Sequence, residues 1–250
     1  MPVHANEVVV RPDARPDIAR DGVGLVKVST WDVGTPERQR AAIEAIGAAW
    51  RKRSWPDLGL LSYTVHVGND GRTLLHYSQW TGEDAYQQFF SEGFRDERNA
   101  EIDAAVPGIR RLGLHSYELY RGGRGNPGDL RVPGCVVIVE VEFDGPDRDR
   151  QRDWVDGVFD ALASDPGPAD GEPGPHAAGI SGWFHVSTDG TRVLNYAEWT
   201  DATSHVTALA APGEGIGSPT DAWDRVHSYP GVGESRVNRY TPGLSLSPGA

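Results

Sequence analysis

Two stretches of the chain match each other closely: SYTVHVGNDGRTLLHYSQWT at Ser62–Thr81 and SGWFHVSTDGTRVLNYAEWT at Ser181–Thr200. They share 9 of 20 residues without a gap, far more than unrelated stretches of this length share by chance. A weaker match lies downstream, where Pro107–Gly108 recurs as Pro230–Gly231. We therefore interpret the chain as a tandem duplication.

A tight turn lies at the centre of the first repeat. Asn69, Asp70 and Gly71 separate two runs of alternating apolar residues, and an Asp-Gly pair tolerates the positive φ angles that a hairpin requires. Upstream, Thr35 followed by Pro36 is typical of a helix N-terminus. The elements predicted for this repeat are strands Leu25–Val33, Leu61–Val67, Arg72–Trp80 and Leu112–Tyr120, a helix from Pro36 to about Arg53, and a helix that opens with a capping box at Thr81–Asp84.

The second repeat predicts the same order, strand–helix–strand–strand–helix–strand, which is the ferredoxin-like unit. Its predicted elements are strands Val136–Phe143, Ile180–Ser187, Thr191–Trp199 and one near Glu234–Tyr240, a helix at Asp149–Ala163, and a second helical region interrupted by Ala211–Pro219. Two helices on one face of such a sheet leave the other face apolar and bare, and a second copy can cover it. The expected fold class is α+β, with two tandem ferredoxin-like repeats forming an internal dimeric α/β barrel.

Segments rich in Gly and Pro divide the chain. Arg121–Gly134 has no apolar period and is typical of a linker, and Ser164–Ala178 is typical of a loop. We expect repeats at residues 23–121 and 135–241, joined by a linker at residues 122–134. The first twenty residues and those from Thr241 onward have the composition of mobile tails, although Val8–Val10 is a candidate edge strand.

Composition excludes several classes of protein. The chain has 24 basic and 36 acidic residues, a net charge of −12, which argues against non-specific nucleic-acid binding. It contains no apolar run long enough to span a membrane and no secretory signal. Cys135 is the single cysteine, so neither an intramolecular disulfide nor a cysteine-based metal site is expected. We expect a cytoplasmic protein.

The candidate chemistry lies on the third strand of each repeat. A period of two places His76, Ser78 and Trp80 on one face, and a small residue between a polar group and an indole leaves room for a flat ring. The alternative is that each Trp is ordinary core and that its polar neighbour bonds a backbone group. The equivalent residues of the second repeat are Asn195, Ala197 and Trp199.

Other residues recur in both repeats or lie nearby. His66 and His185 recur on the second strand, where a structural hydrogen bond to a loop is the alternative to a role in binding. Tyr77 and Tyr196 recur on the face opposite the Trp residues. Helix residues Phe89 and Phe90 are candidates for a ligand wall as well as for the core. The candidate substrate-binding set is therefore His66, His185, Tyr77, Tyr196, Phe89 and Phe90.

The chain resembles the antibiotic biosynthesis monooxygenase family in three features. These are the two ferredoxin-like units, a strand with the pattern Asn-x-x-x-Trp at Asn195–Trp199, and a helix that follows at Thr200. That family includes small anthrone oxygenases, and the resemblance covers about residues 23–121 and 135–241. It implies that Asn195 and Trp199 are catalytic, with His76 and Trp80 at the matching positions of the first repeat. The chain departs from the family in two respects. His76 stands where the family has Asn, and the second Asn that some members carry on the first strand is missing from both repeats.

The resemblance implies an oxygenase of an aromatic polyketide-type substrate, such as an anthrone, a hydroquinone or an angucycline. The O₂ would be activated by the deprotonated substrate or by reduced flavin (FAD or FMN), with no metal and no tightly bound cofactor. The expected roles are oxyanion stabilisation by the Asn195 amide, stacking or N–H donation by Trp199 or Trp80, and proton acceptance by His76. The expected partners are a small aromatic substrate and O₂, without nucleic acid or membrane, and pseudo-dimers could associate into a homo-oligomer.

Two other functions stay open at this stage. A haem-degrading enzyme of the same fold would need an axial histidine, for which only His205 and His227 of the second repeat are suitably placed in the sequence. A non-catalytic barrel that binds a hydrophobic ligand would show no turnover. Fold alone cannot separate these functions, so the site must.

Overall fold

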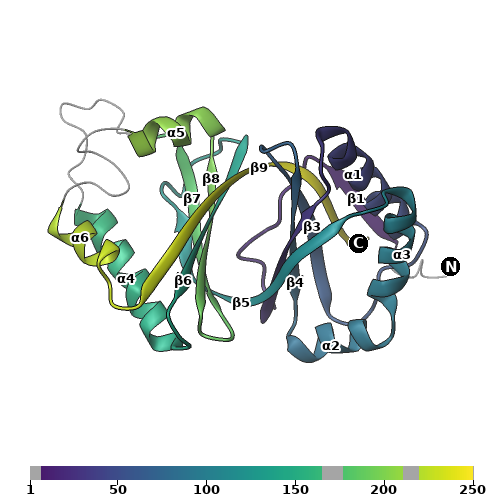
Figure 1. Cartoon of the computed structure of the whole chain (residues 1–250), viewed down its shortest axis with the longest axis horizontal. Coiled ribbons are helices and arrows are strands. Elements are labelled where there is room, and N and C mark those ends of the chain that lie inside the picture. The colour runs from purple at the N-terminus through teal and green to yellow at the C-terminus, as the bar shows by residue number, and fades with distance from the viewer. Residues whose placement is uncertain (1–6, 165–176, 211–219, 250) are drawn as a thin grey trace. The chain divides into compact units, whose positions relative to one another are not determined.

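The computed structural model describes residues 7–164, 177–210 and 220–249 (Figure 1). The chain forms two compact units. Unit 1 extends through Glu118 and also includes the segment from Tyr240 onward, whereas unit 2 comprises Leu119–Arg239. Strands β5 (Arg110–Arg124) and β9 (Val232–Pro248) therefore each contribute residues to both units. In the described residues, no helix is long and apolar enough to cross a membrane.

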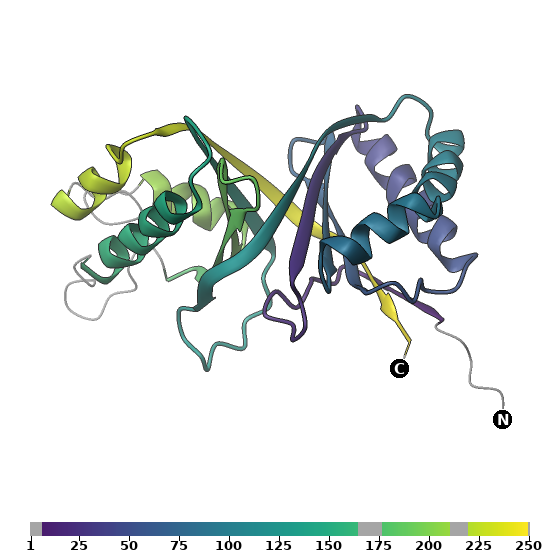
Figure 2. The ribbon, with the colours of Figure 1, turned by 90° about the horizontal axis from the view of Figure 1, so that it is seen from below.

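Unit 1 is an antiparallel sheet with its helices on one face (Figure 2). Its strand order is β1-β9-β3-β4-β2-β5, and the helices bury an apolar core that includes Ile46, Trp50 and Phe89 against the sheet. Besides its parts of β5 and β9, the unit contains β1 (Val8–Pro12), β2 (Leu25–Asp32), α1 (Pro36–Arg51), β3 (Leu60–Gly68), β4 (Thr73–Trp80), α2 (Glu83–Ser91) and α3 (Phe94–Ala105).

Local sequence signals explain the start of α1 and the β3–β4 hairpin. Thr35 Oγ1 accepts a hydrogen bond from the backbone N–H of Arg38 at 3.3 Å, and Pro36 occupies the first turn. Asp70 Oδ1 accepts from the N–H of Thr73 at 2.9 Å, and Gly71 takes a φ of 68°. Both elements were predicted, and the structure confirms them.

The second helix of unit 1 differs from its prediction in two ways. The capping box predicted at Thr81–Asp84 is wrong, because Gly82 is the N-cap and no side chain caps α2. The Thr81 N–H instead donates to the Gly59 carbonyl at 2.9 Å, which holds Thr81 beside the end of the sheet. The helical region is also divided, since Gly93 adopts a φ of 79° between α2 and α3.

Unit 2 repeats the arrangement with strand order β5-β7-β8-β6 and an additional pairing between β6 and β9. Its predicted interruption at Ala211–Pro219 and most of its predicted loop at Ser164–Ala178 lie outside the described residues. Its elements are β6 (Cys135–Phe143), α4 (Arg148–Ser164), β7 (Gly179–Ser187), β8 (Arg192–Trp199), α5 (Ala202–Ala210) and α6 (Asp221–His227).

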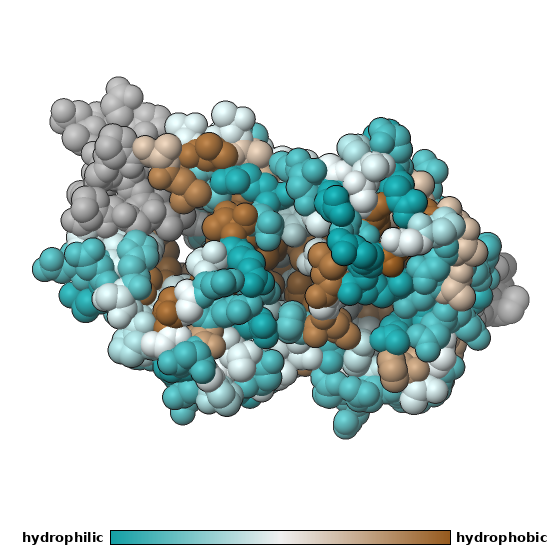
Figure 3. Space-filling view, viewed as in Figure 1, coloured by the Kyte–Doolittle hydropathy of each residue, from teal (hydrophilic) through white to brown (hydrophobic). Residues whose placement is uncertain are grey.

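The surface of unit 2 carries apolar side chains on α5. Val206 and Leu209 are both exposed, and brown, apolar residues gather over this helix in the space-filling view (Figure 3). Elsewhere on that face of the molecule, hydrophilic side chains predominate, in keeping with the acidic composition.

The tail predicted from Thr241 onward is a strand, and the candidate edge strand at Val8–Val10 is confirmed as β1. β9 continues through Thr241 to Pro248, where it pairs with β1 (Val8 opposite Pro248) and with β3 (Tyr63 opposite Leu246). The cause is an alternation of Leu and Ser that buries Leu244 and Leu246 in the core of unit 1. Strand β5 similarly extends to Arg124, so the first residues of the predicted linker are part of the sheet.

The α+β class and the two ferredoxin-like repeats are confirmed. The described residues form nine strands and six helices in the predicted order, with the second helical region of each repeat in two parts. Closure of the two sheets into a barrel, and the repeat limits at residues 121 and 135, stay predictions.

Candidate active site in unit 1

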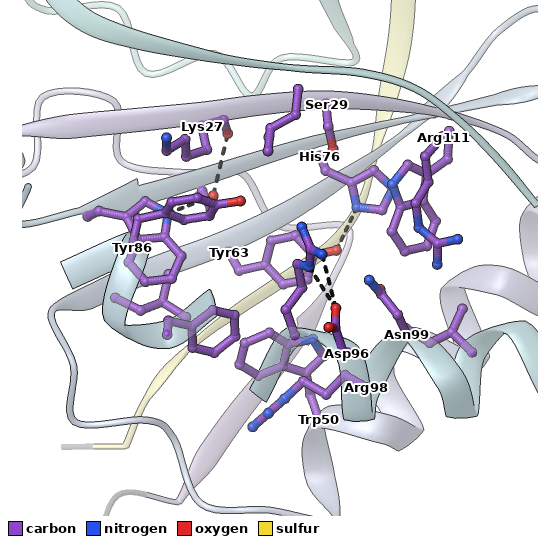
Figure 4. A pocket seen from close by; sticks show the side chains of 18 of the residues that line it. Lys27, Ser29, Trp50, Tyr63, His76, Tyr86, Asp96, Arg98, Asn99 and Arg111 are labelled. Atoms are coloured by element: carbon purple, nitrogen blue, oxygen red, sulfur yellow. Dashed lines mark hydrogen bonds and ion pairs between the residues drawn. The ribbon is translucent and has the colours of Figure 1, made fainter. Parts of the chain in front are cut away.

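A cavity of about 600 Å³ lies in unit 1 between the helix-covered face of the sheet and helices α1, α2 and α3 (Figure 4). Alternate residues of the strands face it, as the period of two predicts. The sheet side is formed chiefly by Lys27, Ser29, Trp31, Tyr63, His76, Ser78, Trp80 and Arg111, and the helix side by Trp50, Tyr86, Phe89, Arg95, Asp96, Arg98, Asn99 and Asp103.

A tyrosine–histidine pair lies at the sheet side of this cavity. The Tyr63 hydroxyl oxygen and Nδ1 of His76 are 2.5 Å apart and share one hydrogen bond, whose donor depends on the imidazole tautomer. Register explains the contact, because Val65, two residues after Tyr63 on β3, pairs directly with His76 on β4. The two side chains therefore extend from neighbouring strands on the same face of the sheet (Figure 4).

The imidazole of His76 is buried and neutral at pH 7. Its side chain is 4% exposed, and Nε2 is buried without a hydrogen-bond partner among the described residues. Burial lowers the pKa of His76 to about 3, with further contributions from Arg111 and His66. Burial also raises the pKa of Tyr63, so this phenol stays protonated at neutral pH. The pair can therefore accept a proton from a ligand only if a nearby negative charge compensates the imidazolium.

Aromatic rings form the walls. The ring centroids of Trp80 and Tyr86 are 5.2 Å apart, edge to face, and those of Trp50 and Tyr63 are 5.4 Å apart. The indole N–H of Trp80 donates to Ser78 Oγ at 2.9 Å. This donor is therefore already used, which favours stacking over N–H donation as the contribution of Trp80.

Each of three wall rings has a cation against it. Lys27 Nζ lies 4.0 Å from the ring centroid of Tyr86 and also donates to both carboxylate oxygens of Glu83, at 2.9 and 3.0 Å. Arg111 lies over Trp31 at 4.5 Å, and Arg98 lies over Trp50 at 4.3 Å. The cavity is thus aromatic and positively charged at once.

Sequence reasoning identified only part of this site. His76, Trp80 and Phe89 line the cavity, and their roles in catalysis or binding stay predictions. Tyr63 was not predicted because the candidates were chiefly residues that recur in both repeats. Gly182 stands at the position of Tyr63 in the second repeat. Asn99 was missed because its place beside the sheet depends on how α3 packs. The difference between Tyr63 and Gly182, within two stretches that otherwise match closely, could have indicated that the two repeats carry different sites.

Other candidates lie away from this cavity. His66 and Tyr77 are fully buried on the opposite face of the unit 1 sheet and do not line it. Phe90 is 42% exposed, beneath the guanidinium of Arg95. Burial lowers the pKa of His66 to about 4, which fits a buried, neutral imidazole.

The candidates of the second repeat lie in unit 2. Asn195 extends from β8 on the same face as Trp199, and its buried Oδ1 has no hydrogen-bond partner in the described part of the chain. Trp199 is buried, with its ring 4.8 Å from that of His205. His185 and Tyr196 are fully buried on the opposite face of this sheet. Whether these residues act in catalysis or binding stays a prediction.

The histidines required by the haem alternative are also placed. Nδ1 of His205 accepts a hydrogen bond from Nε of Arg239 at 3.0 Å, and burial lowers the pKa of His205 to about 4. His227 lies on α6 with its ring near Trp223. Among the described residues, no group of three or more His, Cys, Asp or Glu side chains is arranged to hold a metal ion.

Solved structures share this fold over nearly the whole chain. An anthrone oxidase-like protein is 19% identical, with a TM-score of 0.62 and coverage of 97% of this chain and 98% of that one. The chain has the fold of that protein. A candidate monooxygenase from Fusobacterium nucleatum is 8% identical (TM-score 0.52, coverage 91% and 96%), and a mutant chlorite dismutase from Candidatus Nitrospira defluvii is 11% identical (TM-score 0.51, coverage 90% and 93%). No family model and no curated protein matches the sequence.

Proposed function

We propose that unit 1 binds a flat, hydroxylated aromatic molecule in its cavity and oxidises it with O₂. The hydrogen-bonded Tyr63–His76 pair inside an aromatic cavity of about 600 Å³ carries this proposal. That volume lies within the usual range for small-molecule sites, and the walls suit stacking against a flat ring. Fold neighbours described as anthrone oxidase-like and as a candidate monooxygenase support the same reaction class.

The first step is a proton transfer. The acidic substrate proton passes to the Tyr63 oxygen as the Tyr63 hydroxyl donates its own proton to Nδ1 of His76. Tyr63 ends neutral, His76 becomes an imidazolium, and the substrate becomes an enolate or phenolate beside it. Burial lowers the pKa of His76, and the negative charge of the new anion raises it again. The side-chain amide of Asn99 is available to donate to the substrate oxygen.

Oxidation then uses electrons from the substrate. An anthrone anion gives one electron to O₂, and the radical pair combines into a peroxide anion. The proton held by His76 returns through Tyr63 to give the hydroperoxide, and loss of water leaves the quinone. One anthrone and one O₂ thus give one quinone and one H₂O. A hydroquinone would instead give a quinone and H₂O₂. Reduced flavin is the alternative source of electrons, and the aromatic walls around Trp50 and Trp80 suit an isoalloxazine ring as well as an anthrone.

Unit 2 is proposed to hold a second, chemically different site. Asn195 offers an amide in place of the imidazole of His76, and Trp199 lies on the same face of the strand. An amide stabilises an oxyanion but takes up no proton at neutral pH. We therefore assign most of the turnover to unit 1.

Oxygen uptake with a simple hydroxyanthrone tests the proposal, using metal-stripped protein with and without reduced flavin. Uptake and quinone formation without flavin are expected. Uptake above the flavin background only when reduced flavin is present would assign the electrons to flavin. Absence of uptake in both arms contradicts the oxygenase and leaves the haem enzyme and the non-catalytic binding protein.

A matched pair of variants tests the role of Tyr63. Tyr63→Phe removes only the hydroxyl, and loss of the proton path should lower kcat by about tenfold or more, given the usual size of acid–base catalysis. Tyr117→Phe is the control, because Tyr117 is a fully buried tyrosine of the same unit that does not line the cavity. Equal rates for the two variants would contradict the assignment.

A further inference from the structure

The walls of the cavity carry a charge opposite to that of the whole chain. The protein has a net charge of −12, yet among the described residues four cations and two carboxylates line the cavity. Three of the cations have carboxylate partners: Lys27 bonds Glu83, Arg95 bonds Asp96, and Arg111 bonds Asp103. Arg98 is the fourth, and within the described residues it forms no ion pair, although the carboxylates of Glu97 and Glu101 act on it through space.

Arg98 is an expensive group to bury. Its side chain is 2% exposed, Nη1 donates to the Phe94 carbonyl at 2.9 Å, and Nε and Nη2 are buried without partners in the part of the chain that the structure describes. Burial lowers the pKa of Arg98 to about 10, with a smaller contribution from Arg53 that Glu97 and Glu101 oppose, and the group is still charged at pH 7. Burying a cation that no ion pair holds costs free energy, and a bound anion can offset part of that cost.

Trp50 connects this charge to the cavity. The Arg98 guanidinium lies over the indole of Trp50, and Trp50 is one of the cavity walls (Figure 4). Because the guanidinium is itself buried, its field is screened less than that of a surface charge and reaches a bound ligand without direct contact. The buried charge of Arg98 therefore favours a negatively charged ligand over a neutral one of the same shape.

The rim of the cavity offers donors that suit a carboxylate. Arg95 and Asn99 lie one turn apart on the same face of α3, and Arg111 faces them from β5. The ion pairs of Arg95 and Arg111 are partly exposed, and such pairs contribute little to stability. A ligand carboxylate can replace Asp96 or Asp103 at little cost, because guanidinium groups bind planar carboxylates through two parallel hydrogen bonds.

We propose that the ligand of this cavity is a flat aromatic carboxylate, with its rings against the aromatic walls and its carboxylate at the rim formed by Arg95, Asn99 and Arg111. Arg98 supplies the remaining positive charge through Trp50. This inference rests on the proposed function, because it names the class of substrate that unit 1 would oxidise. It predicts a preference that the oxygenase proposal by itself does not.

Two ligands of nearly equal shape test the preference by calorimetric titration at pH 7.5. Anthraquinone-2-carboxylate should bind about tenfold more tightly than neutral 2-(hydroxymethyl)anthraquinone, because only the first compensates the cavity charge. Equal affinity, tighter binding of the neutral compound, or binding of neither at millimolar concentration would overturn the proposal.

Charge-removing variants locate the cause. Arg98→Met keeps most of the side-chain volume and should reduce the preference to about threefold or less, by weakening the binding of the carboxylate more than that of the neutral ligand. Arg40→Met is the matched control, since Arg40 is an exposed arginine of α1 outside the cavity, and it should keep the full preference. An equal loss of affinity for both ligands in Arg98→Met would show that Arg98 only supports the walls, which contradicts the charge argument.

Oxygen uptake separates this inference from the proposed function. If the carboxylate binds preferentially but an anthrone carboxylate is not oxidised, the inference holds and the oxygenase fails. If a neutral anthrone is oxidised at least as efficiently as its carboxylate, the oxygenase holds and the inference fails.

Discussion

The Tyr63–His76 pair has no counterpart in unit 2. A shift of 119 residues, the one that aligns the repeats, brings Gly182 to the position of Tyr63 and Asn195 to that of His76. Both partners of the hydrogen bond are therefore different, and a Cβ added to Gly182 would lie 3.7 Å from Asn195 Oδ1, in ordinary contact. The acid–base step proposed for unit 1 therefore has no equivalent pair of residues in unit 2.

Buried neutral histidines also make stability depend on pH. The pKa of His76 is lowered from 6.5 to about 3 in the folded chain, so the unfolded chain binds more protons between those values. The contribution of His76 to the free energy of unfolding is fully present above pH 6.5. It is lost as the pH falls toward 3, by up to about 1.4 kcal/mol per pH unit. Urea unfolding of the wild type and of His76→Gln between pH 7.5 and 4 measures this effect. The free energy of unfolding of the variant should fall less steeply with pH than that of the wild type.

An exposed histidine provides the control for that experiment. His227 lies on the surface of unit 2, and His227→Gln should leave the wild-type slope unchanged. If His76→Gln and wild type lose stability in parallel across this range, the buried imidazole is not the cause.

At the scale of elements, the two ends of the chain are joined in unit 1. β9 lies between β1 and β3, and Leu246 is fully buried in the core of this unit. Leu246→Ala should lower the free energy of unfolding by about 2–5 kcal/mol, the usual cost of such a truncation in a core. Val237→Ala, at a position 41% exposed on the same strand, should change it by about 0.5 kcal/mol or less. Chemical denaturation measures both, and a mild effect of Leu246→Ala would restore the interpretation of this segment as a tail.

Features that depend on residues close together in the chain were easier to predict from the sequence than features that depend on residues far apart. The cap at Thr35 and the turn at Asp70–Gly71 depend on residues within a few positions, and both were predicted correctly. The end of β9 was missed because its Gly-, Ser- and Pro-rich composition hides two buried leucines, and its partner β3 lies far away in the chain. A local pattern cannot report such a pairing.

The candidate site divides in the same way. His76 and Trp80 were found because a period of two along a single strand puts them on one face. Tyr63, Asn99 and Arg98 come from another strand and from a helix, and their place at the cavity follows from packing between elements. The residues that set the charge of the cavity were therefore beyond the reach of a strand pattern.

At the scale of the whole molecule, the duplication makes it testable whether the two units act separately. The proposed catalytic residues belong to different compact units, Tyr63 to unit 1 and Asn195 to unit 2. If each unit has its own site, their rates add, and the activity left in Tyr63→Phe belongs to unit 2. Asn195→Ala should then remove that remainder, although in the wild-type background it should lower the total rate by only about a tenth, as expected when unit 1 supplies the acid–base step.

Steady-state oxygen uptake by the two single variants and the double variant decides this, with circular dichroism to confirm that all three fold. Independent sites require the rates of the single variants to sum to the wild-type rate and the double variant to be inactive. Loss of all turnover in Asn195→Ala alone would mean that the two units work on one substrate in sequence or share one site. An unchanged residual rate in the double variant would instead remove Asn195 from catalysis and leave unit 1 as the sole site of oxidation.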